Sequence, residues 1–323
     1  MNTVQRYREF ARDSRDESPA YEELAAAVAE DQELLWLLDD LPEPKRQPNL
    51  FFAATRYLGG PVMPPAAFRD WAVSHWADLT ATMHELSTQT NEPARCATLL
   101  PVLAGLPQPL ALLEVGAAAG LCLYPDEYQY RFDGVSIGPP ESLVRIDCAV
   151  SGDVPVPADV PKVVWRAGID LNPLDVADDN DLRWLESLIW PGQPERVARL
   201  RAAARIVGAH PPMIRRGDLI AELPALAAQA PASATLVVFH SAVLVYLSAE
   251  TRRAFVDIVQ SLPGHWISNE GPDVLPELVA RVRLPTNGPP PFVLALDGTP
   301  LALAAPHGQA LHWLRRAPTT LRK

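Results

Sequence analysis

From residue 109 onward, short apolar runs alternate with longer amphipathic stretches, and this alternation constrains the fold more than any other feature of the chain. Continuous apolar runs separated by helical stretches are typical of a parallel sheet that is covered on both faces. The last two runs flank the turn sequence DGTP, so we expect the sheet to end in an antiparallel pair. The seven expected strands are 111–115, 163–169, 213–218, 235–240, 265–270, 292–297 and 301–306, with helices at about 179–208, 218–229, 249–262 and 273–281.

The first third of the chain has a different pattern, because residues 1–108 contain only helical signals. The stretch SPAYEELAAAVAEDQELLWLL begins with Ser18 as a plausible N-cap and Pro19 at the first helical position. We therefore expect a helical N-terminal domain over 1–108 and an α/β domain over 109–323. The interval 130–160 is rich in glycine and proline, and we expect it to form an inserted β-hairpin or flap.

Composition excludes several classes of function. A net charge of -11 argues against broad binding to nucleic acid, which needs clustered lysine and arginine. The three cysteines show no zinc-site spacing, so we expect free thiols and no metal site. The N-terminus lacks a signal-peptide core, and no window approaches the roughly 18 apolar residues that a membrane span needs. These features predict a cytoplasmic protein without membrane or nucleic-acid partners.

Polar residues follow the expected strands repeatedly. In a doubly wound sheet, ligands bind beyond the carboxyl ends of the strands, at the point where the strand order reverses. This rule selects the segments 114–120, 170–172, 217–218, 240–241 and 268–270. Their convergence at one edge of the sheet is a stronger indication of a binding site than any single motif.

The segment LLEVGAAAG carries the clearest motif. Gly116 would permit a backbone angle that other residues avoid, and Gly120 would let a following helix pack close to the strand with its free N–H groups facing a ligand. A plain strand-to-helix turn remains the structural alternative. Ala118 replaces the middle glycine of a dinucleotide fingerprint, and the next acid follows about 50 residues later rather than about 20, so a nicotinamide-dependent oxidoreductase is disfavoured.

Four segments together resemble the class I S-adenosylmethionine-dependent methyltransferases. LLEVGAAAG resembles their nucleoside-binding turn, AGIDLNPLD their second strand, RRGDLIAELP their third and TLVVFHSAVLVYLS their fourth. The resemblance covers about residues 110–306. It implies a Rossmann-like fold with a mostly parallel seven-stranded sheet and an antiparallel last strand, and it implies S-adenosylmethionine as the cofactor.

The same resemblance implies the cofactor-binding residues. Asp170, with Asn172 beside it, would accept hydrogen bonds from the ribose hydroxyls, and Asp218 would meet the adenine amino group. Alternatives remain open, because Asp170 also suits an Asx-turn and Asp218 also suits a helix N-cap. The full set comprises Glu114, Gly116, Ala118, Gly120, Asp170, Asn172, Asp218 and Ser241.

Residues on the substrate side are predicted from their positions. His240 and Glu92 are the candidate general bases, although a histidine at a strand end is often structural. The cluster TQTNEPARC is expected to form part of a lid over the cofactor, and capping of the next helix by Thr90 or Asn91 is the alternative. The substrate-binding candidates are Asn49, Asn91, Arg95, Tyr246, Asn269 and Glu270.

Nearly the whole chain also resembles an uncharacterised bacterial family, DUF2332. The segments SPAYEELA, PNLFFAATRYL, TQTNEPARCATLLP, WRAGIDLNPLDV and SNEGP carry this resemblance. We expect a methyltransferase that acts on a small molecule, with a non-catalytic binding or scaffold protein as the alternative. The methyl acceptor and the oligomeric state are left open by the sequence.

Overall fold

The computed structural model describes residues 2–286 and 290–314, and these residues form two compact units. The helical unit contains the chain up to Thr90 together with Asp175–Arg201. The sheet unit contains Asn91–Leu174 and the described residues from Ala202 onward. Residues 91–108, which we expected in the helical domain, thus group with the sheet, and residues 175–201 group with the helices.

The helical unit is built from short helices. The stretch that follows Ser18 forms two helices instead of one continuous helix, because Asp31 accepts a hydrogen bond from the Leu34 amide and starts a new helix. Ser18 does occupy the N-cap position, but its hydroxyl donates to the carbonyl of Pro191 instead. The elements are α1 (Thr3–Ser14), α2 (Pro19–Val28), α3 (Gln32–Asp39), η1 (Glu43–Lys45), α4 (Pro48–Tyr57), α5 (Pro65–Ser74), α6 (Trp76–Glu85), α8 (Asp179–Leu188) and the first half of α9 (Pro194–Ala209).

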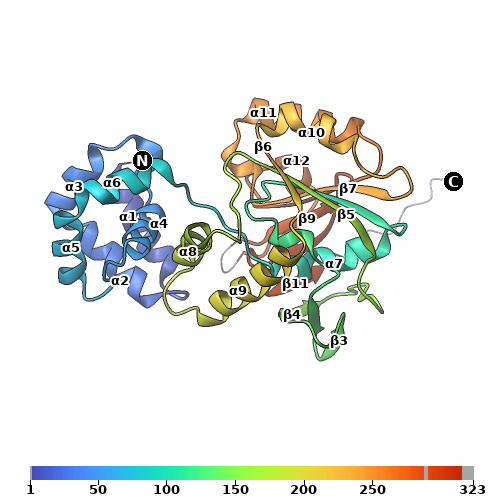
Figure 1. The fold of residues 1–323 in the computed structure, drawn as a ribbon, viewed down its shortest axis with the longest axis horizontal. Helices are drawn as coiled ribbons and strands as arrows, with labels where there is room; N and C mark the ends of the chain where they lie inside the picture. The colour runs from blue at the N-terminus through green and yellow to red at the C-terminus, as the bar shows by residue number, and fades with distance from the viewer. Residues whose placement is uncertain (1, 287–289, 315–323) are drawn as a thin grey trace. The chain divides into compact units, whose positions relative to one another are not determined.

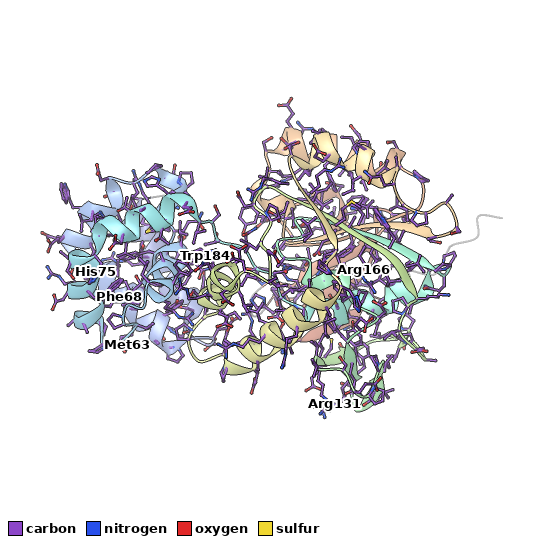
Figure 2. All side chains as sticks on the ribbon, viewed as in Figure 1. Met63, Phe68, His75, Arg131, Arg166 and Trp184 are labelled. Atoms are coloured by element: carbon purple, nitrogen blue, oxygen red, sulfur yellow. The ribbon has the colours of Figure 1, made fainter. Side chains whose placement is uncertain are left out.

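Aromatic side chains form the core of the helical unit. Phe52 lies at its centre, with its ring centroid 4.9 Å from that of Tyr21 and 5.6 Å from that of Phe68, which is labelled in Figure 2. Trp184 of α8, also labelled there, is fully buried and donates its indole N–H to the carbonyl of Ser87. Aromatic packing of this kind, tilted for Tyr21 and edge-to-face for Phe68, stabilises a small helical core beyond the area that it buries.

The sheet unit contains one sheet of eleven strands, in the order β3-β2-β4-β11-β10-β9-β8-β7-β1-β5-β6. All seven expected runs are strands, but the expectation of a seven-stranded sheet was wrong. The four additional strands come from the 130–160 interval and from the segment after β10. The strands are β1 (Leu110–Val115), β2 (Gln129–Phe132), β3 (Val135–Ile137), β4 (Arg145–Ser151), β5 (Val163–Asp170), β6 (Met213–Arg216), β7 (Thr235–Ser241), β8 (His265–Glu270), β9 (Phe292–Leu296), β10 (Thr299–Ala304) and β11 (Ala310–Trp313).

The expected insert is part of the sheet itself. Strands β2 and β3 form an antiparallel hairpin, β2 pairs with β4 in parallel, and β4 pairs in parallel with β11. Strand β11 therefore joins the insert to the remaining seven strands. Alternate side chains of the insert, such as Tyr130, Phe132, Ile146 and Cys148, are buried. A free-standing hairpin could not bury them, so the insert packs as part of the sheet unit.

The order of the strands reverses at β1. The chain runs from β1 to β5 and β6 on one side, and then returns to β7 and β8 on the other side, with all five strands parallel. Strand β9 is antiparallel to β8, and β10 is antiparallel to β9. The carboxyl ends of β1 and β7 are therefore the switch point at which open sheets of this kind bind ligands.

Helices cover both faces of the central strands (Figure 1). Helices α10 (Leu219–Ala227), α11 (Ala249–Ser261) and α12 (Pro276–Val279) pack on one face, where they bury alternate residues of β1, β5, β7 and β8. Helix α7 (Arg95–Gly105) is buried along most of its length and contacts β4 and β9. The structure thus confirms a mixed α/β protein with a large, mostly parallel sheet and, within the described residues, twelve α-helices.

The glycine turn does not lead into an α-helix, which corrects our expectation for Gly120. It is followed by a single 3-10 turn, η2 (Leu121–Leu123), after which the chain proceeds to β2. Pro125 stands two residues beyond η2, and a proline lacks the N–H that a continuing helix would need. The N–H groups of this segment are therefore not arranged as a helix N-terminus facing a ligand.

Candidate functional site

The turn after β1 is held by backbone and carboxylate groups of its own unit. Both Gly116 and Ala117 donate their N–H groups to the carbonyl of Ile169 at the end of β5. Ala118 adopts a left-handed backbone, with a φ of 48°, and donates its N–H to Oδ2 of Asp170 at 2.8 Å. Asp170 thereby connects the ends of the two neighbouring strands.

Asn91 completes the turn from the opposite direction. Its Oδ1 accepts the N–H groups of Ala119 at 3.3 Å and Leu121 at 3.1 Å. Helix α7 begins at Arg95, with Ala94 as an N-cap residue that makes no side-chain cap. The alternative that Asn91 caps this helix was therefore wrong, and the residue instead ties the segment before α7 to the glycine turn.

The two glycines of the turn have neighbours within the protein. A Cβ on Gly116 would lie 2.4 Å from Cγ2 of Val243, and a Cβ on Gly120 would lie 2.9 Å from Cγ of Pro212. Both residues also have positive φ, 72° and 74°. Packing and backbone conformation therefore explain these glycines without reference to a bound molecule.

Arg95 lies in a buried group of charges at the switch point. Its Nε donates to the carbonyl of Pro306, and its Nη1 donates to the carbonyl of Ser241, each at 3.0 Å. Burial lowers the pKa of the guanidinium, and the charges of nearby groups, among them Glu92, Glu114 and Glu270, raise it. A buried cation with several carboxyl groups around it is a common feature of ligand-binding sites.

Glu114, in the middle of the polar cluster, is 4 % exposed. Burial raises its pKa well above the ordinary range, and the neighbouring Cys122 raises it further, while Arg95 acts in the opposite direction. Its Oε2 has no hydrogen-bond partner among the described residues. Burial therefore favours the protonated form of the Glu114 carboxyl group.

His240 and Glu270 form a buried pair. Nδ1 of His240 lies 2.6 Å from Oε1 of Glu270, and Nε2 accepts the indole N–H of Trp266 at 3.0 Å. Because an indole can only donate, Nε2 must be unprotonated, and Nδ1 carries the hydrogen that it donates to Glu270. Both ring nitrogens of the predicted general base are thus engaged inside the protein.

The exit of β8 contains polar atoms that lack partners. Oε1 of Glu270 also accepts the N–H groups of Val243 and Leu244, but Oε2 has no partner among the described residues. The same holds for Oδ1 of Asn269 and the hydroxyl of Ser268, both of which are buried. Native proteins leave few buried polar groups unsatisfied, so this group of atoms indicates a place for water or a ligand.

Two further predicted residues lie beside these atoms. Asn269 donates its Nδ2 to the hydroxyl of Ser241 at 3.0 Å, across the pair β7 and β8. Tyr246 follows in η3 (Leu244–Tyr246) and is 75 % exposed. Desolvation of its hydroxyl raises the pKa of Tyr246, and the charges of Arg95 and Glu270 shift this pKa in opposite directions.

The remaining predicted residues have structural contacts. Oδ1 of Asp170 accepts the amide of Asn172 in an Asx-turn, and Asp218 accepts the amides of Ile220 and Ala221 as the N-cap of α10. Asn49 belongs to the helical unit, where its Oδ1 accepts the indole N–H of Trp190. The Asx-turn at Asp170 and the N-cap at Asp218 are therefore both present. The roles of these two residues toward a cofactor stay predictions, and so does the lid expected from TQTNEPARC.

No group of three histidine, cysteine or acidic residues within 2–286 and 290–314 is placed to hold a metal ion. In the same residues, no helix is long and apolar enough to cross a membrane.

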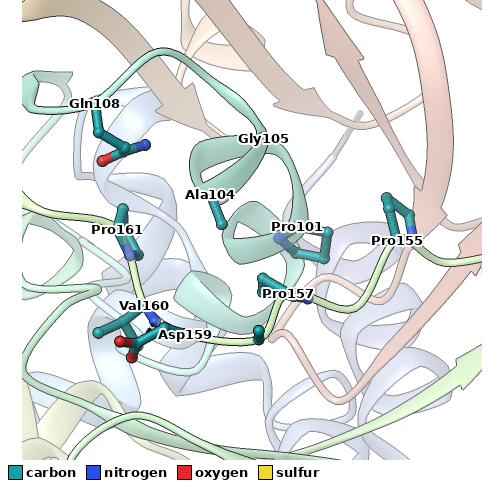
Figure 3. Close-up of a pocket in the computed structure, with 10 residues that line it drawn as sticks. Pro101, Ala104, Gly105, Gln108, Pro155, Pro157, Asp159, Val160 and Pro161 are labelled. Carbon is teal, nitrogen blue, oxygen red and sulfur yellow. Dashed lines mark hydrogen bonds between the residues drawn. The ribbon is translucent and has the colours of Figure 1, made fainter.

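The proline-lined pocket in Figure 3, about 400 Å³, contains none of the predicted site residues. Its Gln108 side chain bonds to the carbonyls of Leu103 and Leu106 and to the amide of Lys162.

A family model for an "Uncharacterized protein conserved in bacteria (DUF2332)" matches residues 4–313. The chain belongs to the DUF2332 family. Comparisons with curated proteins and with solved structures found no match. The family description assigns no chemistry, so the function of this DUF2332 protein has to be argued from its own site.

Sequence reasoning missed two residues of the site in this DUF2332 chain. Trp266 stands two residues before Ser268 and shares its face of β8, where it fixes the tautomer of His240. Cys122 lies next to Glu114 and donates its thiol to the carbonyl of Glu92. The alternation along β8 could have indicated Trp266, whereas no local pattern indicates Cys122.

Proposed function

We propose that this protein is an S-adenosylmethionine-dependent methyltransferase that acts on a small molecule. One observation carries the proposal: at the switch point of the sheet, the buried cation Arg95 lies near Glu114 and Glu270, each of which has a buried carboxyl oxygen without a partner among the described residues. The reversal of strand order at β1 supports a binding site at this edge of the sheet. The segments that resemble methyltransferases support the same position.

The donors and acceptors present fit the methionine part of this cofactor. Its carboxylate would face Arg95, and its ammonium group would donate to Oδ1 of Asn269 and Oε2 of Glu270. When bound, the cofactor supplies an electrophilic methyl group. We assign the ribose to Asp170 and the adenine amino group to Asp218, as the resemblance implies.

The protein would act mainly by positioning. Methyl transfer from a sulfonium needs donor and acceptor in line and little covalent help, so most of the rate enhancement comes from orientation. His240 holds Glu270 through Nδ1 and is a positioning residue in this scheme. Where an acceptor requires a base, Glu92 takes this role, because both nitrogens of His240 are bonded.

Isothermal titration with S-adenosylmethionine and S-adenosylhomocysteine tests the proposal. We expect micromolar binding to the wild type and a loss of at least about tenfold in Asn269→Ala and Asp170→Asn, since each removes a polar contact worth about 1–2 kcal/mol. Asp147→Asn is the matched control, because Asp147 is an exposed residue of β4 that pairs with Arg131. Absence of heat with both ligands would reject the methyltransferase and favour a binding or scaffold protein.

A further inference from the structure

A second pocket lies over the middle of β5, at Arg166. It has a volume of about 490 Å³, within the roughly 300–1,000 Å³ of small-molecule sites. All of its lining belongs to the sheet unit. The residues that matter for its chemistry are Tyr124, Glu127, Leu143, Arg166, Arg205 and Ile206.

Arg166, labelled in Figure 2, is held in a fixed position. Its guanidinium lies over the ring of Tyr124 at 4.6 Å, and its Nη1 donates to the carbonyl of Leu123 at 2.8 Å. Its Nη2 pairs with Asp126 at 2.7 Å, and the side chain is only 17 % exposed. A guanidinium has five N–H donors, and the contacts among the described residues use two of them.

Arg205 adds a second cation to the same pocket. It is exposed on α9, and within the described part of the chain it forms no ion pair. Ile206 follows it in the pocket wall, and the hydroxyl of Tyr124 donates to the carbonyl of His210 just beyond α9. This hydrogen bond connects the wall formed by α9 to the ring that supports Arg166.

The charged and apolar residues that line the pocket determine which ligand it can bind. Asp126 balances Arg166, and the exposed Glu127 at the rim disfavours a dianion, so a ligand with a single negative charge fits best. Guanidinium groups bind planar carboxylates through two parallel hydrogen bonds. Leu143 and Ile206 provide an apolar wall for the rest of the molecule.

We infer that this pocket binds a small planar monocarboxylate, with its carboxylate on Arg166 and Arg205 and its apolar body against Leu143 and Ile206. The site is separate from the carboxyl edge of the sheet and does not depend on the proposed methyltransferase activity.

Ligand-observed NMR with benzoate, and with inorganic phosphate as the comparison, tests this inference. We expect saturable benzoate binding by the wild type, a loss of at least tenfold in Arg205→Gln, and weaker binding of phosphate than of benzoate. Arg131→Gln is the matched control, because Arg131 is an exposed arginine of β2 outside this pocket (Figure 2), and it should bind benzoate as the wild type does.

Three results would overturn the inference: no benzoate signal from the folded wild type, equal binding by Arg205→Gln and Arg131→Gln, or displacement of benzoate by S-adenosylhomocysteine. Benzoate binding in a protein that fails to bind S-adenosylmethionine would support this pocket and reject only the proposed function.

Discussion

At the scale of the residue, the buried carboxyl groups of Glu114 and Glu270 differ in their surroundings. Oε1 of Glu270 accepts three N–H donors, whereas its Oε2 has no partner among the described residues. Glu114 is desolvated, and burial raises its pKa well above the ordinary range. The two carboxyl groups therefore differ: that of Glu270 is held by hydrogen bonds, whereas burial favours a bound proton on that of Glu114.

We expect the stability of the folded protein to depend on pH through Glu114. Its pKa is raised in the folded state, so the folded protein holds the proton more tightly and loses stability as the pH rises above about 4.5. Glu114→Gln lacks this loss, so its free energy of unfolding should increase relative to the wild type between about pH 5 and pH 8. Urea unfolding at several pH values measures the difference, and a difference independent of pH would contradict the assignment.

We expect truncation of the His240 side chain to cause a large loss of stability. His240→Ala leaves the indole of Trp266 without its acceptor and Glu270 without one donor, which should cost about 3 kcal/mol or more of unfolding free energy. His265→Ala is the control, because this partly exposed histidine pairs with Asp297 at the surface and should cost less than about 1 kcal/mol. Equal losses in urea unfolding would show that the buried pair has no special role.

At the scale of the element, the turn after β1 depends on close packing. Gly116→Ala places a methyl group against Val243 as well as straining a positive φ, so we expect a loss of more than about 2 kcal/mol. Gly134→Ala strains a φ of 92° but meets no neighbour within 4 Å, and should lose only about 1 kcal/mol. Urea unfolding compares the two variants. In a protein that also carries Val243→Ala, the loss of stability caused by Gly116→Ala should be smaller, whereas the loss caused by Gly134→Ala should be unchanged.

The strands around this turn could be predicted from the sequence, whereas some strand pairings and some hydrogen-bond partners of the turn could not. The seven runs are all strands, and inner strands such as β1 and β7 are recognisable because a strand buried on both faces is continuously apolar. Strands β2 and β4 were missed as members of the sheet because they alternate and because β11, the strand that joins β4 to the rest of the sheet, lies more than 150 residues away. The contacts of Asn91 and Cys122 with residues about 30 positions away likewise depend on tertiary structure that no local pattern shows.

At the scale of the whole molecule, the sheet unit depends on one short strand. Among the strands of the described residues, β11 alone joins β4, β2 and β3 to the other seven. Leu311→Asp places a charge at a position of β11 that is 1 % exposed and should cost more than about 3 kcal/mol. His312→Asp, at the exposed neighbouring position, is the control.

Hydrogen exchange distinguishes these two variants. The amides of β4 that pair with β11 should exchange faster in Leu311→Asp and not in His312→Asp. Exchange in β4 that is the same in both variants would show that the insert is held without β11.

We propose that the carboxyl edge of β1, β7 and β8 binds a cofactor of the S-adenosylmethionine type. Hydrogen exchange with and without S-adenosylhomocysteine tests it most directly, because the readout reports where a ligand acts. We expect slower exchange in residues 114–122, 241–247 and 268–271, with no change in 129–151. No change anywhere, or protection confined to 129–151, would contradict it.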